Sequence, residues 1–304
     1  MSEVGRDQSP FVLRAWLAEH LRGYRAKAKL SQSDAAKRVD WSVSKLQRIE
    51  TEVVGISVSD TRALLGTYEV TDPSTVERLL FVARAARKRD RFSQHRRFFT
   101  PEYNVLLSYE ESASEIRSVS SFALPGLLQT PGYARALLAV RHSGSKLDGL
   151  VEARTLRQEI LFASNSPYFL FLIDEAMLRR QVGGRKVLLE QLKHLQQMAE
   201  LDTLDLRVIP FEADVHLGLW EQFVIMTIPA SELTGEASET IVYREAGDSE
   251  HLVRHDPERV DWYEKAFEEV LEQTLSPVDS RRLIERMGRE LAEPLPARPE
   301  SIAR

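Results

Sequence analysis

The chain has 304 residues and a formal net charge of −5, with 43% hydrophobic and 29% charged residues, which is typical of a globular protein of about two domains. It contains no cysteine, and this excludes disulfide scaffolds, thiolate metal sites and cysteine nucleophiles. The N-terminal residues carry charge without an apolar segment, and the longest apolar runs, such as 168–173, are too short to span a bilayer. We therefore expect a cytoplasmic, nucleoid-associated protein without a signal peptide or membrane contact.

Charge is distributed unevenly along the chain. Residues 1–100 contain 19 Lys and Arg against 12 Asp and Glu, a net charge of +7, whereas residues 101–304 carry −12. A basic N-terminal part on an acidic remainder predicts that only the N-terminal part meets a polyanion such as DNA.

Residues from Phe11 to about Arg97 are predicted to be almost entirely helical. Leu13, Trp16, Leu17, Leu21 and Tyr24 recur at helical spacing after a Ser9-Pro10 start. Capping residues and apolar pairs predict four further helices, at about 31–39, 42–50, 59–68 and 73–89.

Two short predicted helices, 31–39 and 42–50, are joined at Asp40-Trp41, and the small Ala36 allows them to cross closely. This pattern is typical of a helix-turn-helix, whose second helix enters the major groove of DNA. The segment from about 17 to 72 resembles the Cro/C1-type phage-repressor (Xre) family, with Gln32 after a serine at the second helix and Glu50 ending the third.

The geometry of this motif assigns roles to individual residues. Base-edge readers are expected in the first half of the third helix, where Arg48 suits guanine and Gln47 suits adenine. Gln32 begins a helix whose N-terminal amides favour a phosphate. The complete set of predicted DNA-binding residues is Gln32, Ser42, Val43, Ser44, Lys45, Gln47 and Arg48.

Two positions, Asp40 and Glu52, depart from the family pattern, and a third residue, Glu50, is expected to have a structural role. Asp40 stands where glycine usually supplies a left-handed residue, and Glu52 replaces a second glycine and adds an acidic group near the DNA backbone. Glu50 is expected to hold the turn or an arginine, because a carboxylate repels the duplex. The basic run 84–97 is either a phosphate clamp or the solvated face of a linker helix.

Beyond residue 100 the chain alternates between predicted helices and strands. Helices are predicted at 112–118, 131–139, 150–162, 175–181, 185–199 and 257–274, and strands at 168–173, 204–211, 221–228 and 240–245. A crossover through two helices allows strands 168–173 and 204–211 to pair in parallel, and the later strands should form an antiparallel meander. The proline-rich tail 293–304 is predicted to be disordered.

Several segments of this second part are distinctive, including Leu124–Arg135, Arg157-Gln158, Ile173–Gly184 and Arg207–Pro210. With the helix-turn-helix they make the chain similar, over nearly its whole length, to the actinobacterial Xre regulators of the WhiJ type. The resemblance implies a regulator whose C-terminal domain has no assigned chemistry, and a very small partner protein encoded by a neighbouring gene.

The second part offers one partner- or ligand-binding hypothesis, on Leu127, Leu128, Tyr133, Asp174, Arg179 and Arg180. The alternative is structural, with Leu127 and Leu128 in the core and Asp174 capping a helix. No nucleophile elbow, phosphate-binding glycine loop or zinc-protease motif is present, so we expect neither enzyme activity nor a metal or cofactor.

Taken together, the sequence predicts an all-α helix-turn-helix N-terminal domain and an α+β C-terminal domain. The predicted boundaries are 1–90 for the first domain, 91–100 for a basic linker, 101–280 for the regulatory domain and 281–304 for a helix end and tail. The predicted function is a sequence-specific transcriptional regulator that binds double-stranded DNA as a homodimer and whose C-terminal domain senses a partner protein or small ligand. The alternative is an antitoxin-like or interaction module with a structural dimerisation domain.

Overall fold

A computed structural model describes residues 8–52, 54–88, 91–231, 233–246 and 249–293. The chain divides into two units: one contains residues up to Ser114 together with Met226–Thr240, and the other contains Glu115–Ile225 and Ile241 onward. The first unit extends past the predicted linker at 91–100, because α6 (Pro101–Glu110) packs against α1 (Pro10–Lys27). The described part of the chain has no helix with the length and apolar character needed to cross a bilayer.

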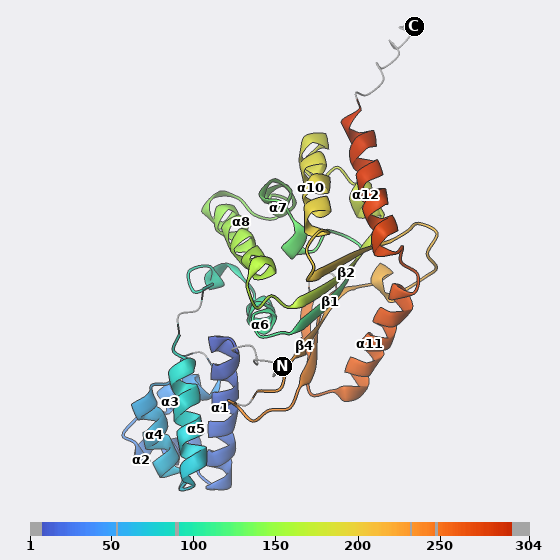
Figure 1. Ribbon diagram of the computed structural model, residues 1–304. Helices are drawn as coiled ribbons and strands as arrows, with labels where there is room; N and C mark the ends of the chain where they lie inside the picture. The colour runs from blue at the N-terminus through green and yellow to red at the C-terminus, as the bar shows by residue number, and fades with distance from the viewer. Residues whose placement is uncertain (1–7, 53, 89–90, 232, 247–248, 294–304) are drawn as a thin grey trace. The chain divides into compact units, whose positions relative to one another are not determined.

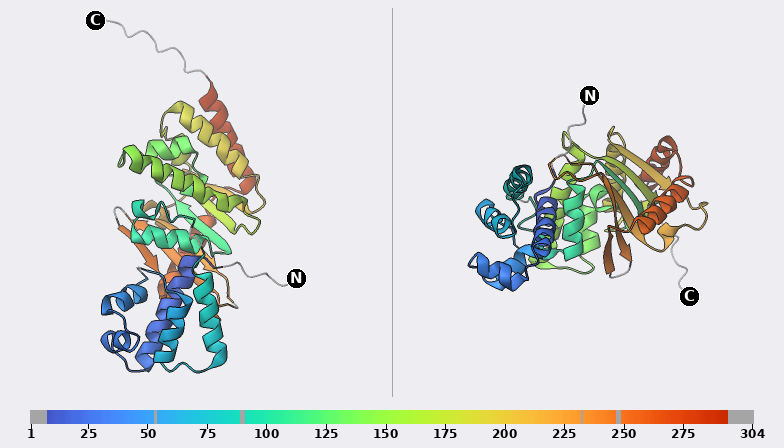
Figure 2. Two further views of the ribbon diagram at one scale, coloured as in Figure 1. Left: turned by 90° about the vertical axis from the view of Figure 1, so that its left-hand side faces the viewer. Right: turned by 90° about the horizontal axis from the view of Figure 1, so that it is seen from below.

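The first unit contains the five predicted helices, which Figure 2 shows from a second side. After α1 come α2 (Gln32–Arg38), α3 (Val43–Glu50), α4 (Val58–Thr67) and α5 (Pro73–Ala85). Each begins at a serine or aspartate whose side chain accepts a hydrogen bond from a backbone N–H of the first turn, which satisfies a donor that the helix leaves open. Their apolar faces meet in one core, which includes Leu17, Leu21, Leu46 and Leu64.

The turn between α2 and α3 has the predicted left-handed residue. Asp40 has a φ of 57°, and Trp41 N–H donates to the Ala36 carbonyl at 2.8 Å to close the turn. Glu52, in the position of the second expected glycine, also has a positive φ, of 65°. The backbone therefore adopts the left-handed conformation at both positions where the family has glycine, although the side chains of Asp40 and Glu52 strain it slightly.

Asp40→Gly is expected to leave the free energy of unfolding unchanged or to raise it by less than about 1 kcal/mol. Glycine adopts a positive φ without strain, but it also gives the unfolded chain more freedom. Asp40→Val should lower the free energy of unfolding by about 1–2 kcal/mol, because a branched Cβ clashes in this conformation. Urea unfolding of the full chain, followed by tryptophan fluorescence, measures both changes. A valine variant as stable as the wild type would contradict the left-handed turn.

The second unit is built on a six-stranded sheet with the order β3-β2-β1-β4-β5-β6. The strands are β1 (Glu115–Ser120), β2 (Tyr168–Asp174), β3 (Leu204–Ile209), β4 (Gln222–Ile228), β5 (Glu239–Ala246) and β6 (Ser249–Val253). β2 pairs in parallel with both β1 and β3, as predicted for 168–173 and 204–211, and β5 pairs antiparallel with β6. The C-terminal domain is α+β, and this prediction is confirmed.

The prediction of a helix at 112–118 is wrong, because most of this segment belongs to β1. Its Glu115, Arg117 and Ser118 resemble a solvated helix in sequence, but Arg117 is bound within the fold. The Arg117 guanidinium donates to Glu264 at 2.9 Å and lies 5.5 Å from the ring centre of Phe267. Both partners belong to α11 (Pro257–Leu271), and Glu264 is 147 residues from Arg117 in sequence.

Helices cover both faces of the sheet (Figure 1). One side carries α7 (Pro131–Leu138), α8 (Gly144–Gln158), α10 (Arg185–Met198) and α12 (Pro277–Ala292), and the other carries α11. α8 begins six residues before the predicted start at 150, and the predicted helix 175–181 is only the four-residue α9 (Ala176–Arg179). α12 ends at Ala292, and the tail from 294, predicted to be disordered, lies outside the described residues.

Candidate nucleic-acid interface

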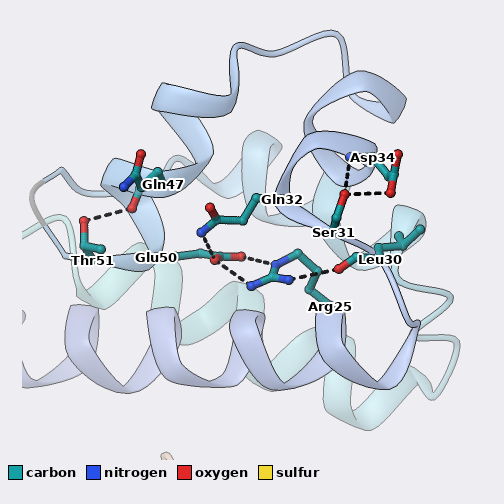
Figure 3. Close-up of polar contacts among 8 residues, drawn as sticks. All are labelled: Arg25, Leu30, Ser31, Gln32, Asp34, Gln47, Glu50 and Thr51. Carbon is teal, nitrogen blue, oxygen red and sulfur yellow. Dashed lines mark hydrogen bonds and ion pairs between the residues drawn. The ribbon is translucent and has the colours of Figure 1, made fainter.

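A buried ion pair fixes α3 against α1 and α2 (Figure 3). The Glu50 carboxylate, whose side chain is 1% exposed, accepts hydrogen bonds from Arg25 Nε at 2.6 Å and Nη2 at 2.9 Å. Gln32 Nε2 donates to the same carboxylate at 2.8 Å, and Arg25 Nη1 donates to the Leu30 carbonyl at 2.9 Å. The hydrogen bond to Glu50 raises the pKa of Arg25. The predicted structural role of Glu50 is confirmed.

The opposite face of α3 is open to solvent. Leu46 and Ile49 are buried in the core, whereas Val43, Ser44, Gln47 and Arg48 are exposed. In Figure 3 the Gln47 side chain points away from the Arg25–Glu50 pair. Within the described residues neither Gln47 nor Arg48 has a side-chain hydrogen bond or ion pair, so both are available to base edges. Ser42 is exposed and caps α3 through Lys45 N–H at 3.2 Å.

Two predicted phosphate contacts already have protein partners. The Lys45 ammonium lies 3.2 Å from the Asp60 carboxylate and 3.6 Å from the ring centre of Trp41. Its side chain is 41% exposed, so a phosphate contact there would compete with Asp60. Gln32 uses one amide N–H for Glu50, which leaves its second amide N–H for a phosphate.

The basic run 84–97 divides between bound and exposed side chains. Arg96 donates to the Asn104 side chain at 3.1 Å and to Ser108 at 3.2 Å, and it lies 5.0 Å from the ring centre of Phe11. These contacts join the run to α6 and α1 inside the first unit, which we call the helical unit. Arg84, Arg87 and Lys88 are exposed at the end of α5. The run is therefore partly structural, and among its described residues exposed cations occur both in its first part, at Arg84 and Arg87, and near its end, at Arg97.

The loop between β4 and β5 packs against the helices of the first unit. No pattern in the sequence predicts this contact. Trp16 Nε1 donates to the Glu236 carboxylate at 2.7 Å, and its ring stacks on His20 with the ring centres 3.8 Å apart. Leu233 packs against the helical core. A Cβ on Gly235, whose φ is +72°, would lie 2.8 Å from the Arg78 guanidinium. Contacts between residues 220 positions apart leave no signal in local sequence patterns.

The structure places three residues of the predicted partner site, Leu127, Leu128 and Tyr133, in the core, where their side chains are 2%, 0% and 1% exposed. Buried amides hold this corner together. Gln191 donates to the Leu128 carbonyl at 2.6 Å and accepts from Thr130 N–H at 2.7 Å. The structural alternative, a compact corner in the core, describes this segment.

The remaining candidates of the second unit form a local network. Asp174 accepts from Ala176 N–H at 2.7 Å, as expected for a residue that starts a helical turn. Glu175 is buried and binds Arg179 at 2.7 Å, while Arg180 is exposed. Asp174 therefore has the local backbone-capping role of the structural alternative, and Arg179 and Arg180 remain as surface cations.

Comparison with known protein families gives two matches, one in the N-terminal part of the chain and one in the C-terminal part. A helix-turn-helix domain model matches residues 16–79, which contain α2 and α3, and a model described as a domain of unknown function (DUF5753) matches residues 103–286. Neither a curated protein nor a solved structure gives a significant match to the chain. No group of His, Cys, Asp or Glu suited to a metal ion occurs in the described residues.

Proposed function

The chain belongs to the DUF5753 family, and we propose that it is a sequence-specific DNA-binding transcriptional regulator that reads DNA with α3. Its helix-turn-helix domain indicates DNA binding. The observation that supports this specific proposal is that α3 has two different faces: one is fixed to the neighbouring helices, and the other is exposed to solvent. Glu50 is held by Arg25 and Gln32, while Gln47 and Arg48 are exposed and lack side-chain partners within the described residues.

In vitro selection of a random duplex library by the full chain tests this proposal. We expect enrichment of a short motif that contains a guanine, for Arg48, and an adenine, for Gln47. Retention of duplexes without any enriched sequence would contradict sequence-specific reading. The proposal assigns no catalytic step to the chain.

We also propose that the regulator acts as a homodimer on an inverted repeat. One helix-turn-helix contacts a short site, so specificity in a genome normally comes from two half-sites about 34 Å apart. Sedimentation of the full chain with a selected duplex should give two chains for each duplex at saturation. One chain for each duplex at saturation would exclude the homodimer.

The C-terminal domain is proposed to sense a small basic protein or a small ligand. Residues 101–304 carry a net charge of −12, and such a surface repels DNA but attracts a basic partner. The resemblance to WhiJ-type actinobacterial regulators supports the same proposal through the small protein encoded beside such genes. With Leu127, Leu128 and Tyr133 buried, the candidates that remain on the surface are the exposed Arg179 and Arg180.

A map of DNA occupancy across the genome, made with and without the neighbouring small protein, tests the sensing proposal. A partner changes DNA affinity only if it binds the free and DNA-bound forms unequally, so occupancy should change when the partner is removed. The alternative, an antitoxin-like or interaction module with a structural dimerisation domain, is favoured if occupancy and the affinity for a selected duplex both stay the same.

A further inference from the structure

Large apolar side chains are concentrated in one part of the surface of the second unit. Between β3 and β4, the loop 211–221 exposes four of them within ten residues: Phe211, Val215, Leu219 and Trp220. A fifth, Trp262, is exposed on α11, and the short helix η4 (Leu217–Leu219) of the loop contacts α11. We name these five residues the Trp220 surface. An exposed apolar patch on a folded domain typically marks an interaction site.

The loop that carries most of the Trp220 surface is fixed to the domain. At its end, Glu221 accepts a hydrogen bond from the Tyr263 hydroxyl at 2.7 Å, which joins the loop to α11. In its middle, His216 is buried, and a Cβ on Gly218 would lie 2.6 Å from a methyl carbon of Val119 in β1. The loop therefore packs on the sheet and on α11 while its large apolar side chains face solvent. A partner that binds here would not have to order the loop first.

The loop also carries negative charge. Residues 211–221 contain three acidic residues and no Lys or Arg, a net charge of −3. One of the three, Glu221, is buried and lies 2.7 Å from the Arg244 guanidinium, so its charge is compensated. Glu212 and Asp214 are exposed. The exposed charge of the loop is therefore purely acidic.

The charge of α11, around Trp262, has the same sign. The helix contains five acidic residues against two basic ones, a net charge of −3. Of the basic residues, Lys265 lies 2.6 Å from the Asp261 carboxylate and is thereby neutralised. Glu258 and Glu269 are exposed on the same helix. This excess of acid attracts a basic partner and disfavours contact between two copies of the surface.

Tryptophan rings with carboxylates nearby are suited to Lys and Arg side chains. The cations are attracted to the face of the ring, and their aliphatic stems pack on apolar surface. The loop already contains one such arrangement: the Arg179 guanidinium lies 5.5 Å from the ring centre of Phe211 and 2.7 Å from the Glu175 carboxylate. Trp220, which is 76% exposed, and Trp262, which is 50% exposed, offer larger rings to solvent.

We propose that the Trp220 surface binds a basic segment of a partner protein, whose Lys or Arg side chains stack on Trp220 and Trp262 and pair with the acidic residues of the loop and α11. The inference rests on the proposed sensing role of the C-terminal domain, and it gives that role a surface outside the six residues expected from the sequence. Residues 1–100 of a second copy are also basic, but the proposed function assigns their charge to DNA. The oligomeric state tests that alternative occupant.

Selection from a library of random peptides displayed on phage tests the chemistry of the occupant. The immobilised full chain should enrich peptides that combine Lys or Arg with apolar residues. One selected peptide then serves as the probe, and its Kd is measured by fluorescence anisotropy. Enrichment of neutral or acidic peptides, or no enrichment at all, would overturn the inference.

Single substitutions test the place of binding. Trp220→Ala and Trp262→Ala should each raise the Kd of the selected peptide by about tenfold, because tryptophans contribute strongly at interfaces. Phe162→Ala is the matched control, since Phe162 is an exposed aromatic residue on η3 (Glu159–Phe162) of the same unit, and its Kd should equal that of the wild type. All three side chains are exposed, so the variants should keep the thermal unfolding midpoint of the wild type. An unchanged Kd in both tryptophan variants would overturn the inference.

A double substitution tests the contribution of charge. Glu212→Gln combined with Asp214→Asn should weaken the selected peptide and make its Kd less dependent on salt, because the attraction between exposed charges is screened by ions. Glu200→Gln combined with Asp202→Asn removes the same charge from exposed acids of the loop before β3, and it should leave the Kd unchanged. Equal effects of the two pairs would mean that only the net charge of the chain attracts the peptide, which contradicts a defined surface.

Sedimentation of the wild type and of Trp220→Ala, without DNA or peptide, tests the second copy. Equal masses support the basic partner. A wild-type oligomer that dissociates in Trp220→Ala assigns the surface to a second copy and overturns the inference. Failure of the sensing proposal is a separate result: a peptide that binds in a tryptophan-dependent way but leaves the affinity for a selected duplex unchanged supports the Trp220 surface and refutes its role in sensing.

Discussion

Glu50→Ala is expected to lower the free energy of unfolding of the helical unit by about 3 kcal/mol. The substitution removes the acceptor of two hydrogen bonds from Arg25 and one from Gln32, and it leaves the Arg25 guanidinium without its counter-charge. Breaking a buried pair by removing one partner typically costs about 3–5 kcal/mol. The lower figure applies because the Arg25 side chain is 18% exposed and keeps its bond to the Leu30 carbonyl.

Urea unfolding of the full chain measures this change, with Glu50→Gln and Glu19→Gln alongside. Glu50→Gln keeps the shape and one acceptor, so its loss should lie between those of wild type and Glu50→Ala. Glu19→Gln is the control, because Glu19 is an exposed acid on the same unit with no ion pair in the described residues. A Glu50→Ala variant within about 1 kcal/mol of wild type would mean that the ion pair does not anchor α3.

The helical unit could be predicted well because its signals are local. Each helix begins at a serine or aspartate cap, and its apolar residues recur every three or four positions, so the observed boundaries mostly lie within a residue or two of the predicted ones. The left-handed turn at Asp40 follows from the same short-range reasoning. The exception is the end of α5, which stops at Ala85 although the helical composition continues.

The sheet could be predicted only in part, because the identity of a strand depends on what covers it. β2 is a continuous apolar run, which predicts a strand. β1 instead places Glu115, Arg117 and two serines around only two apolar residues, and the partners of Arg117 are on α11. β6 carries Glu250 and His251 at the edge of the sheet, where one side is open, and it has no apolar run to mark it.

The candidate site, too, could be predicted from the sequence only in part. The exposed readers on α3 follow from the helical period, because the buried pair Leu46 and Ile49 fixes the opposite face. The engagement of Lys45 by Asp60 does not follow, because the ion pair joins two helices whose packing the sequence does not state. The same limit explains why the sequence leaves Leu127 open as either a core or a partner-site residue, although Gln129 and Gln191 enclose its segment.

Arg48→Ala is expected to weaken binding to a selected duplex by about 1–3 kcal/mol, or roughly 5- to 150-fold in Kd. Arg48 is exposed on α3 without an ion pair in the described residues, so its guanidinium is free to bind guanine O6 and N7. Its removal should also relax the preference at one base pair. Repeating the duplex selection with the variant measures that relaxation directly.

Lys45→Ala is the matched comparison, because it removes a cation from the same helix without removing a predicted reader. It should weaken selected and random duplexes by similar factors, and only modestly, since the Lys45 ammonium already contacts Asp60 and Trp41. The two variants therefore separate base reading from phosphate attraction on a single helix. An Arg48→Ala variant that loses affinity equally for every duplex would make Arg48 a phosphate contact, and base reading would then have to come from Gln47, Ser44 and Val43.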